Sequence, residues 1–254
     1  MTKITKQQEK LHLESMELIN SDKPLTQDEK WFIVKNYSPN ATNLTTGTGT
    51  FFTPESIGFE FASFSDPQGD IVELCAGIGS LSFYIIERDQ YSGHRPAGWV
   101  SPEIKNLVCL EINPEYVTVG KRLIPEAEWI TGSVFNETLI RSINRCDCVI
   151  SNPPFGAILS NDSRDWIKFN KKSCFDLSVV SVALELSDSG CFILPKGRTY
   201  YDVDKHEKIN NPLHDEFKEK TGFMLTPSSW DLEEFRNDWT YAKPSVEFVS
   251  VDKA

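Results

Sequence analysis

Four consecutive residues, Asn152-Pro153-Pro154-Phe155, place a carboxamide, two prolines and an aromatic ring directly after an apolar stretch. A proline lacks an N–H, fixes its own φ at about −65° and pushes the preceding residue toward extended geometry. The carbonyls of Asn152 and Pro153 should therefore point outward as a stiff array of acceptors beside the flat face of Phe155. Such an array suits a planar group that carries N–H, such as an adenine amino group or a side-chain amide. The alternative is a proline-stiffened surface turn.

A second segment of interest runs Glu73-Leu74-Cys75-Ala76-Gly77-Ile78-Gly79, at the end of an apolar run of strand length. Two glycines permit a sharp turn and a close approach of the backbone to a ligand, although ordinary strand–helix turns share this pattern. A later strand ends in Glu111, where a carboxylate can accept hydrogen bonds from ribose hydroxyls. The dinucleotide pattern GxGxxG fails because residue 82 is Ser, and no Walker lysine follows. These features favour an adenosine-containing cofactor without a pyrophosphate.

The elements that must hold these residues alternate between strands and helices from residue 70 onward. Strands are expected at 70–75, 107–111, 127–130, 146–151 and 190–194, with helices at about 79–88, 113–123 and 173–187. Near-continuous apolar strands between helices predict an α/β, doubly wound, mostly parallel sheet covered on both faces. Segments 222–226 and 245–251 predict an antiparallel pair that closes this sheet.

The first residues indicate a helical N-terminal extension over 1–46, ahead of a main domain over 47–254. Residues 4–20 form a loosely amphipathic pattern. Thr26 and Glu29 predict a capping box for a second helix that ends near residue 35. Residues 37–50 are rich in Ser, Thr, Asn and Gly and indicate a loop, after which a helix is expected over 55–64.

Composition narrows the class of protein without deciding it. The chain has 254 residues, of which 39% are hydrophobic, enough for one sizeable core and a small appended subdomain. A net charge of −11 argues against a protein that coats nucleic acid, yet a nucleic-acid enzyme needs only a local basic rim. Lys168, Lys171 and Lys172 are candidates for that rim. No apolar run is long enough for a membrane span and the N-terminus has no signal-peptide centre, so we expect a cytoplasmic protein without a membrane partner.

The cysteines suggest neither disulfides nor a zinc site. They lie mostly in apolar strand-like runs and form no CxxC pair: Cys75, Cys109, Cys146, Cys148, Cys174 and Cys191. Buried free thiols in a reducing compartment are the expected state, and no metal is expected.

Taken together, the motifs resemble those of class I S-adenosylmethionine-dependent methyltransferases. The similarity is to N6-adenine DNA methyltransferases with an Asn-Pro-Pro-Tyr/Phe motif, including modification subunits of type I systems. The matching elements are, in order, Gly49-Thr50-Phe51-Phe52-Thr53-Pro54, the ExxxGxG loop at 73–79, Glu111 and the Asn-Pro-Pro-Phe turn. The resemblance covers roughly residues 47–200. It implies a Rossmann-like fold with a seven-stranded, mostly parallel sheet and an antiparallel C-terminal strand.

The resemblance also implies S-adenosyl-L-methionine as cofactor and a role for each matching residue. Glu73 would lie near the methionine part, with Phe52 and Thr53 closing over it, while Glu111 would hold the ribose and Ile112 would pack on the adenine. The implied cofactor-binding set is Phe52, Thr53, Glu73, Cys75, Gly77, Gly79, Glu111, Ile112, Ser133 and Asn152. The implied catalytic set is Asn152, Pro153, Pro154 and Phe155.

One residue and one inserted segment depart from the family pattern. The family commonly has an acidic residue after the third strand, which accepts a hydrogen bond from the cofactor's adenine amino group. This chain has Ser133 at that position, and its hydroxyl can accept a hydrogen bond but carries no negative charge. A long insertion at 89–105 contains several glycines and prolines and is expected to be a loop against the cofactor or substrate.

The Asn-Pro-Pro-Phe turn suits methyl transfer to a poorly nucleophilic amino group. The Asn152 side-chain oxygen and the Pro153 carbonyl can accept its two hydrogens, and Phe155 can stack on a base that has left its duplex. Adenine in DNA is the favoured acceptor, because Phe-Phe-Thr-Pro and the segment 192–197 resemble the DNA-modifying subgroup. Adenine in RNA, a protein glutamine, and a catalytically silent methyltransferase-like subunit remain alternatives.

Substrate recognition is less well defined by the sequence. Little of the chain follows Gly197, so sequence choice in the DNA is expected to be loose or to come from a specificity or partner subunit. The segments 157–170 and 197–218 are the expected substrate-facing loops. Their possible contacts are Arg164, Trp166, Lys168 and Arg198.

Overall fold

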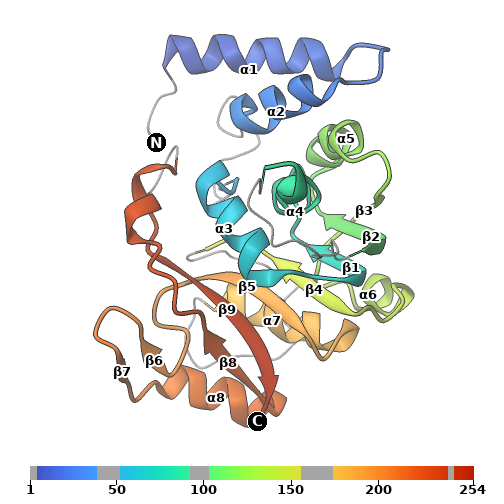
Figure 1. The fold of residues 1–254 in the computed structure, drawn as a ribbon. Coiled ribbons are helices and arrows are strands. Elements are labelled where there is room, and N and C mark those ends of the chain that lie inside the picture. Colours follow the sequence, from blue (N-terminus) through green and yellow to red (C-terminus); the bar gives the residue numbers. More distant parts are fainter. Residues whose placement is uncertain (1–4, 39–51, 92–102, 156–173, 240–242) are drawn as a thin grey trace, which may run out of the picture.

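A computed structural model describes residues 5–38, 52–91, 103–155, 174–239 and 243–254. Seven strands form one sheet in the order β3-β2-β1-β4-β5-β9-β8 (Figure 1). The strands are β1 Gly69–Leu74, β2 Ile104–Glu111, β3 Glu128–Thr131, β4 Cys148–Ser151, β5 Gly190–Pro195, β8 Phe223–Pro227 and β9 Val246–Lys253. The helices are α1 Lys6–Ile19, α2 Gln27–Asn36, α3 Glu55–Ser65, α4 Ser80–Tyr91, α5 Pro114–Leu123, α6 Glu137–Ser142, α7 Phe175–Leu186 and α8 Pro212–Thr221.

The strand directions confirm the predicted fold class. Strands β1 to β5 pair in parallel, and β9 runs antiparallel to both β5 and β8. The strand order reverses at β1, which has β2 on one side and β4 on the other. In open α/β sheets, ligands bind beyond the carboxyl ends of the strands at such a reversal.

Helices cover both faces of the sheet, with α3, α4 and α5 on one face and α6, α7 and α8 on the other (Figure 1). Each face has its own apolar core, because successive side chains of a strand point in opposite directions. Within β1, Ile71 belongs to the core under α3 to α5, whereas Val72 belongs to the core under α7. Burial on both faces explains why the central strands are apolar at nearly every position.

The N-terminal helices α1 and α2 pack on the α3–α5 side of the molecule (Figure 1). Both begin with a complete capping box, at Thr5 and, as predicted, at Thr26 with Glu29. Trp31 of α2 meets the ring of Phe83 edge-on at 4.7 Å. Arg122 of α5 donates to the carbonyl of Lys23, 2.6 Å away, between the two helices. This extension therefore shares the core of the sheet, and its expected boundary at residue 46 lies outside the described residues.

Several C-terminal elements were not expected. The segment 197–218 was predicted as a loop, and this is wrong, because it contains β6 (Tyr201–Asp202), β7 (Glu207–Lys208) and the start of α8. Asn211 caps α8 through its side chain, and Pro212 occupies the first turn. These are ordinary helix-start signals that were present in the sequence. A 3-10 helix, η3, follows at Glu233–Asn237.

The predicted loops at 89–105 and 37–50 lie only partly within the described residues. Helix α4 runs to Tyr91 and β2 begins at Ile104, so the ends of the 89–105 insertion are regular structure. Its middle, 92–102, lies outside the described residues, as does most of the expected loop 37–50. All six cysteines are free thiols. No helix in the described ranges is long and apolar enough to cross a bilayer.

The contact between α1 and the end of α2 should depend on pH. His12 is buried, and its Nδ1 accepts a hydrogen bond of 3.1 Å from the backbone N–H of Ser38. Burial lowers the pKa of His12 below its ordinary 6.5. As pH falls below 6.5, the unfolded chain gains a proton at this residue before the folded chain does, so stability is lost.

We therefore expect the melting temperature to fall between pH about 7.5 and about 5.5 by less in His12→Gln than in the wild type. Scanning calorimetry at both pH values measures this difference. His206→Gln, which changes an exposed histidine, is the matched control. An equal fall in the wild type and in His12→Gln would contradict the assignment.

Candidate cofactor and acceptor site

Three strand ends converge at the reversal of the sheet. The hydroxyl of Ser151, the last residue of β4, donates to the carbonyl of Leu74 at 2.6 Å. The backbone N–H of Ala76 donates to the carbonyl of Leu110 in β2 at 3.0 Å. The loop after β1, the end of β2 and the Asn-Pro-Pro-Phe turn after β4 are thereby held at one edge.

The loop after β1 has a backbone that favours glycine at three positions. Cys75, Gly77 and Gly79 have φ values of +56°, +58° and +83°. A Cβ on Gly77 would lie 3.1 Å from Cε1 of Phe52, so the ring of Phe52 lies close over this loop. A Cβ on Gly79 would lie 2.9 Å from the indole of Trp129, so packing, in addition to the turn, requires that glycine. Cys75 adopts the left-handed region with a side chain, a strained conformation found often near functional sites.

Glu111 is the charged residue that ties the loop to β2. Its side chain is buried; Oε2 accepts the N–H of Gly77 at 2.8 Å and Oε1 accepts that of Asn113 at 2.9 Å. Burial raises the pKa of Glu111, and these backbone hydrogen bonds oppose the rise. A carboxylate has about four acceptor positions, so it retains capacity for further donors such as hydroxyl groups.

Ile112, the next residue, is exposed to an unusual degree. It is 64% exposed, and only one other large hydrophobic side chain in the described ranges, Leu13, is comparably exposed. An isolated exposed isoleucine is ordinary on a protein surface. Its position directly beside the buried Glu111 gives a flat ligand both a polar anchor and an apolar face.

Glu73, the residue before the last of β1, is hydrogen-bonded to the first turn of α4. It lies on the same face of β1 as Ile71, beneath α4, and its Oε2 accepts the N–H of Ser82 at 3.2 Å and also the Ser82 hydroxyl. Burial raises the pKa of Glu73 to about 8, against the two hydrogen bonds from Ser82. The parity of the strand placed this carboxyl under the helix, a signal that was available in the sequence.

Ser133 follows β3 at the same edge. Its hydroxyl oxygen accepts the backbone N–H of Phe135 at 3.2 Å. The oxygen therefore supports its own turn, while the hydroxyl hydrogen can still be donated.

The Asn152 carboxamide has a hydrogen-bond partner at its nitrogen and none at its oxygen among the described residues. Its Nδ2 donates to the Thr53 hydroxyl at 2.9 Å, across 99 residues of sequence. Its Oδ1 is enclosed and meets no hydrogen-bond donor among the described residues. An enclosed acceptor without a donor costs about 1–3 kcal/mol, a cost that an incoming N–H would remove.

The rest of the turn is packed. Pro153 is buried, Pro154 is half-buried, and the half-buried Phe155 packs against the core on the α3–α5 side. The structure thus brings Asn152 together with Thr53 and Phe52, which come from the segment before α3.

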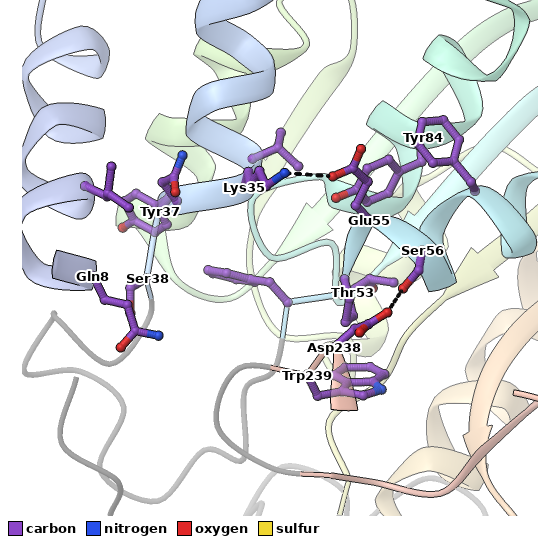
Figure 2. Close-up of a pocket in the computed structure, with 16 residues that line it drawn as sticks. Gln8, Lys35, Tyr37, Ser38, Thr53, Glu55, Ser56, Tyr84, Asp238 and Trp239 are labelled. Atoms are coloured by element: carbon purple, nitrogen blue, oxygen red, sulfur yellow. Dashed lines mark hydrogen bonds and ion pairs between the residues drawn. The ribbon is translucent and has the colours of Figure 1, made fainter. Parts of the chain in front are cut away.

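Thr53 also lines a cavity of about 720 Å³ (Figure 2). The cavity lies between the N-terminal helices, the start of α3 and the end of η3. Lys35 and Glu55 form an ion pair across it at 3.4 Å, and Ser56 donates to Asp238 at 2.6 Å. Glu111, Ile112 and Gly77 do not line it, whereas Phe52, which covers Gly77, does.

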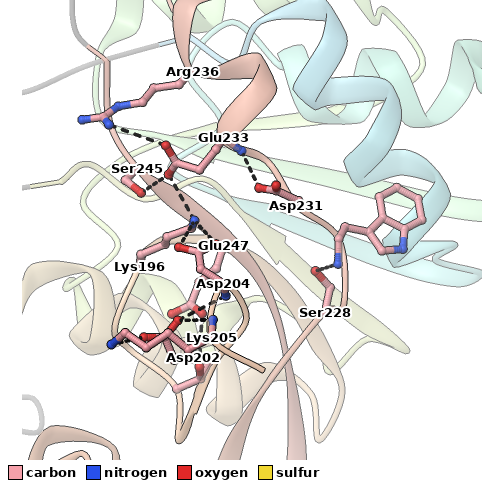
Figure 3. Close-up of polar contacts among 12 residues, drawn as sticks. Lys196, Asp202, Asp204, Lys205, Ser228, Asp231, Glu233, Arg236, Ser245 and Glu247 are labelled. Atoms are coloured by element: carbon pink, nitrogen blue, oxygen red, sulfur yellow. Dashed lines mark hydrogen bonds and ion pairs between the residues drawn. The ribbon is translucent and has the colours of Figure 1, made fainter. Parts of the chain in front are cut away.

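The basic residues after β5 are engaged by carboxylates (Figure 3). Lys196 lies 2.9 Å from Asp204 and 3.1 Å from Glu233. Arg198, expected as a substrate contact, donates to both oxygens of the buried Asp176 at 2.6 and 3.3 Å. Sequence reasoning missed Asp176, which sits in the first turn of α7. The pair fastens the loop after β5 to that turn.

Other predicted residues cannot be placed. Gly49, Thr50, Phe51, Arg164, Trp166, Lys168, Lys171 and Lys172 lie outside the described residues. In the described ranges, no group of three or more His, Cys, Asp or Glu side chains could hold a metal ion.

Solved structures share this fold at low sequence identity. A candidate class I S-adenosylmethionine-dependent methyltransferase from Listeria monocytogenes matches with a TM-score of 0.58 and 12% identity, over 97% of this chain and 80% of that one. A candidate RNA methyltransferase from Pyrococcus horikoshii matches with a TM-score of 0.54 and 19% identity, over 84% and 92%. The type I restriction-modification methyltransferase subunit from Streptococcus thermophilus matches with 0.56 and 13%, over 91% and 51%.

These matches define the fold, which is that of S-adenosylmethionine-dependent methyltransferases. The chain spans about half the length of the type I subunit from S. thermophilus. No protein-family model matches the sequence, and a comparison with curated proteins finds no match.

The protonation of Glu73 predicts a second pH dependence. An unfolded chain ionises this carboxyl near 4.5, whereas the folded chain keeps its proton to about pH 8. Stability should therefore fall as pH rises through this window. Glu73→Gln has no proton to lose, so its free energy of unfolding should fall less between pH about 5 and about 8.

Urea unfolding at both pH values measures this effect, with Glu128→Gln as the control at an exposed carboxyl. A Glu73→Gln variant that follows the wild-type pH dependence would show that Glu73 is ionised in the folded protein.

Proposed function

We propose that this protein transfers a methyl group from S-adenosylmethionine to the N6 amino group of adenine in DNA. The observation that carries the proposal is the enclosed Oδ1 of Asn152, an acceptor without a donor in the described structure, at the reversal point of a methyltransferase sheet. An exocyclic amino group brings the hydrogen that this oxygen lacks.

The residues around the strand ends fit the proposed cofactor. Glu111 offers a buried carboxylate to ribose hydroxyls, and Ile112 offers exposed apolar surface to an adenine ring. Gly77 lets the backbone pass close by, under the ring of Phe52. Ser133 would bind the adenine amino group of the cofactor more weakly than an acidic residue would, because its oxygen already accepts the N–H of Phe135. Cys75 contributes its left-handed backbone rather than its thiol, whose pKa burial raises.

The bound cofactor would supply an electrophilic methyl group. The chain's own task is to align the acceptor and to raise the electron density on its nitrogen, because an aromatic amino group is a poor nucleophile. The Asn152 oxygen and the Pro153 carbonyl would accept the two amino hydrogens, and fixed dipoles of this kind stabilise the positive charge that develops. Phe155 would stack on the base once it has left the duplex.

DNA is proposed as the acceptor on the strength of the motifs and of the fold shared with type I modification subunits. A partner or specificity subunit would then supply sequence choice, in keeping with a cytoplasmic protein. The shared fold with an RNA methyltransferase keeps adenine in RNA as the second possibility.

Labelled methyl transfer to duplex DNA, structured RNA and cell-extract protein, assayed in parallel, tests the acceptor. We expect label on N6 of adenine in DNA, identified after digestion to nucleosides. Label in RNA or protein alone would refute DNA as the substrate. Cofactor binding without transfer to any acceptor would indicate a silent subunit.

Removal of the acceptor oxygen should separate catalysis from cofactor binding. Asn152→Ala is expected to lower the rate of transfer by about 100-fold or more, the typical loss for one preorganised dipole. Its cofactor affinity, measured by calorimetry, should stay near that of the wild type. A parallel loss of both would mean that Asn152 serves mainly to bind the cofactor.

A further inference from the structure

The orientation of the Asn152 carboxamide depends on a residue from another part of the chain. We propose that Thr53 is a positioning residue, whose hydroxyl holds this carboxamide with its oxygen, rather than its nitrogen, toward the acceptor. The inference rests on the proposed function for its catalytic consequence. Its structural basis is the hydrogen bond of 2.9 Å from Asn152 Nδ2 to Thr53 Oγ1.

A carboxamide has two chemically opposite ends. Its oxygen accepts hydrogen bonds, whereas its NH₂ group only donates them. If the amide turned over, Asn152 would present two N–H donors to an amino group that also donates, and the contact would become repulsive. The Asn-Pro-Pro-Phe motif therefore works only if something distinguishes the two ends.

In the structure the Thr53 oxygen accepts from the nitrogen end, and Thr53 can keep the carboxamide in this position because it is itself held firmly. It is 6% exposed, and the following residue, Pro54, disfavours helical geometry at Thr53. Its branched Cβ restricts rotation of the hydroxyl-bearing side chain. Helix α3 begins immediately afterwards, at Glu55, so the position of Thr53 is set by the packing of that helix.

The two ends of Asn152 also differ in their surroundings. Nδ2 has the Thr53 oxygen as its partner, while Oδ1 has no donor among the described residues. Occupation of the nitrogen by Thr53 thus leaves the buried oxygen as the end that lacks a hydrogen-bond partner. In this arrangement Thr53 acts on the acceptor through Asn152 and does not need to touch it.

This role predicts a specific division of kinetic effects. Thr53→Val keeps the shape of the side chain but removes the hydroxyl, so the carboxamide can turn over. We expect kcat to fall about three- to tenfold, the typical consequence of one lost hydrogen bond, with cofactor Kd and acceptor KM changed less than twofold. Thr53→Ser keeps a hydroxyl and should recover most of kcat.

A matched control lies three residues further on. Ser56→Ala also removes a hydroxyl at the start of α3, in this case the one bonded to Asp238 at 2.6 Å. It should leave kcat unchanged. A fall in kcat with Ser56→Ala as large as that with Thr53→Val would mean that any disturbance of α3 lowers the rate, which would overturn the proposal.

A spectroscopic measurement tests the orientation without any turnover. In protein labelled with ¹⁵N-asparagine, the side-chain NH₂ signals of Asn152 can be assigned by their loss in Asn152→Asp. We expect slow hydrogen exchange of these signals in the wild type and in Thr53→Ser, and exchange at least tenfold faster in Thr53→Val. That increase corresponds to the loss of a single hydrogen bond.

The two measurements separate failure of this inference from failure of the proposed function. If the wild type methylates no acceptor, the proposed function fails, and the NMR comparison still decides whether Thr53 holds Asn152. If the wild type is active but Thr53→Val has normal kcat or unchanged exchange, Thr53 is not a positioning residue. Failure of Thr53→Ser to recover either quantity would have the same meaning.

Discussion

The buried carboxylate of Glu111 is the interaction on which the proposed site depends. It accepts the N–H of Gly77 at the end of one strand and that of Asn113 after the next strand. A buried carboxylate is stable only with such partners, and the glycine loop in turn has a definite shape only when its N–H groups are satisfied. The left-handed backbone at Cys75 and Gly77 is maintained by this mutual requirement.

A chain of aromatic rings connects this loop with the N-terminal helices. Phe52, which covers Gly77, lies 5.2 Å from the ring of Tyr116 and 5.9 Å from that of Tyr37, and Tyr37 lies 5.0 Å from His12 in α1. These contacts are part of the core that also includes α3 and α4. The N-terminal extension therefore supports the residues that close over the proposed cofactor site.

Two basic side chains after β5 are paired with carboxylates of the same chain. Lys196 is paired with Asp204 and Glu233 (Figure 3). Arg198 is paired with Asp176. Cations held in this way stabilise the loops after β5 and are less available to phosphate groups. This arrangement fits the net charge of −11 and the proposal that a partner subunit recognises the acceptor.

Sequence alone determined the strands β1 to β5 with the helices α4, α5 and α7, the closing antiparallel pair and the capping box at Thr26, but it missed the short helix α6 between β3 and β4. Each follows from local rules: apolar period, turn residues and cap chemistry. The hairpin β6–β7 and helix α8 were missed because short polar segments have weak periodicity, even though Asn211 and Pro212 were visible signals. The pairing of Arg198 with Asp176 could not be predicted, because it joins two loops that only the sheet brings together.

The motifs likewise indicated the residue types of the proposed site but not their partners. Asn152, Gly77 and Glu111 could be recognised from spacing. Only tertiary structure decided that Ser82 is the partner of Glu73, that Gly79 faces Trp129, and that Thr53 meets the Asn152 nitrogen. The physical reason is that the spacing of residues in a motif shows which chemical groups the site can contain. The direction of each side chain depends instead on the residues that pack against it from distant parts of the chain.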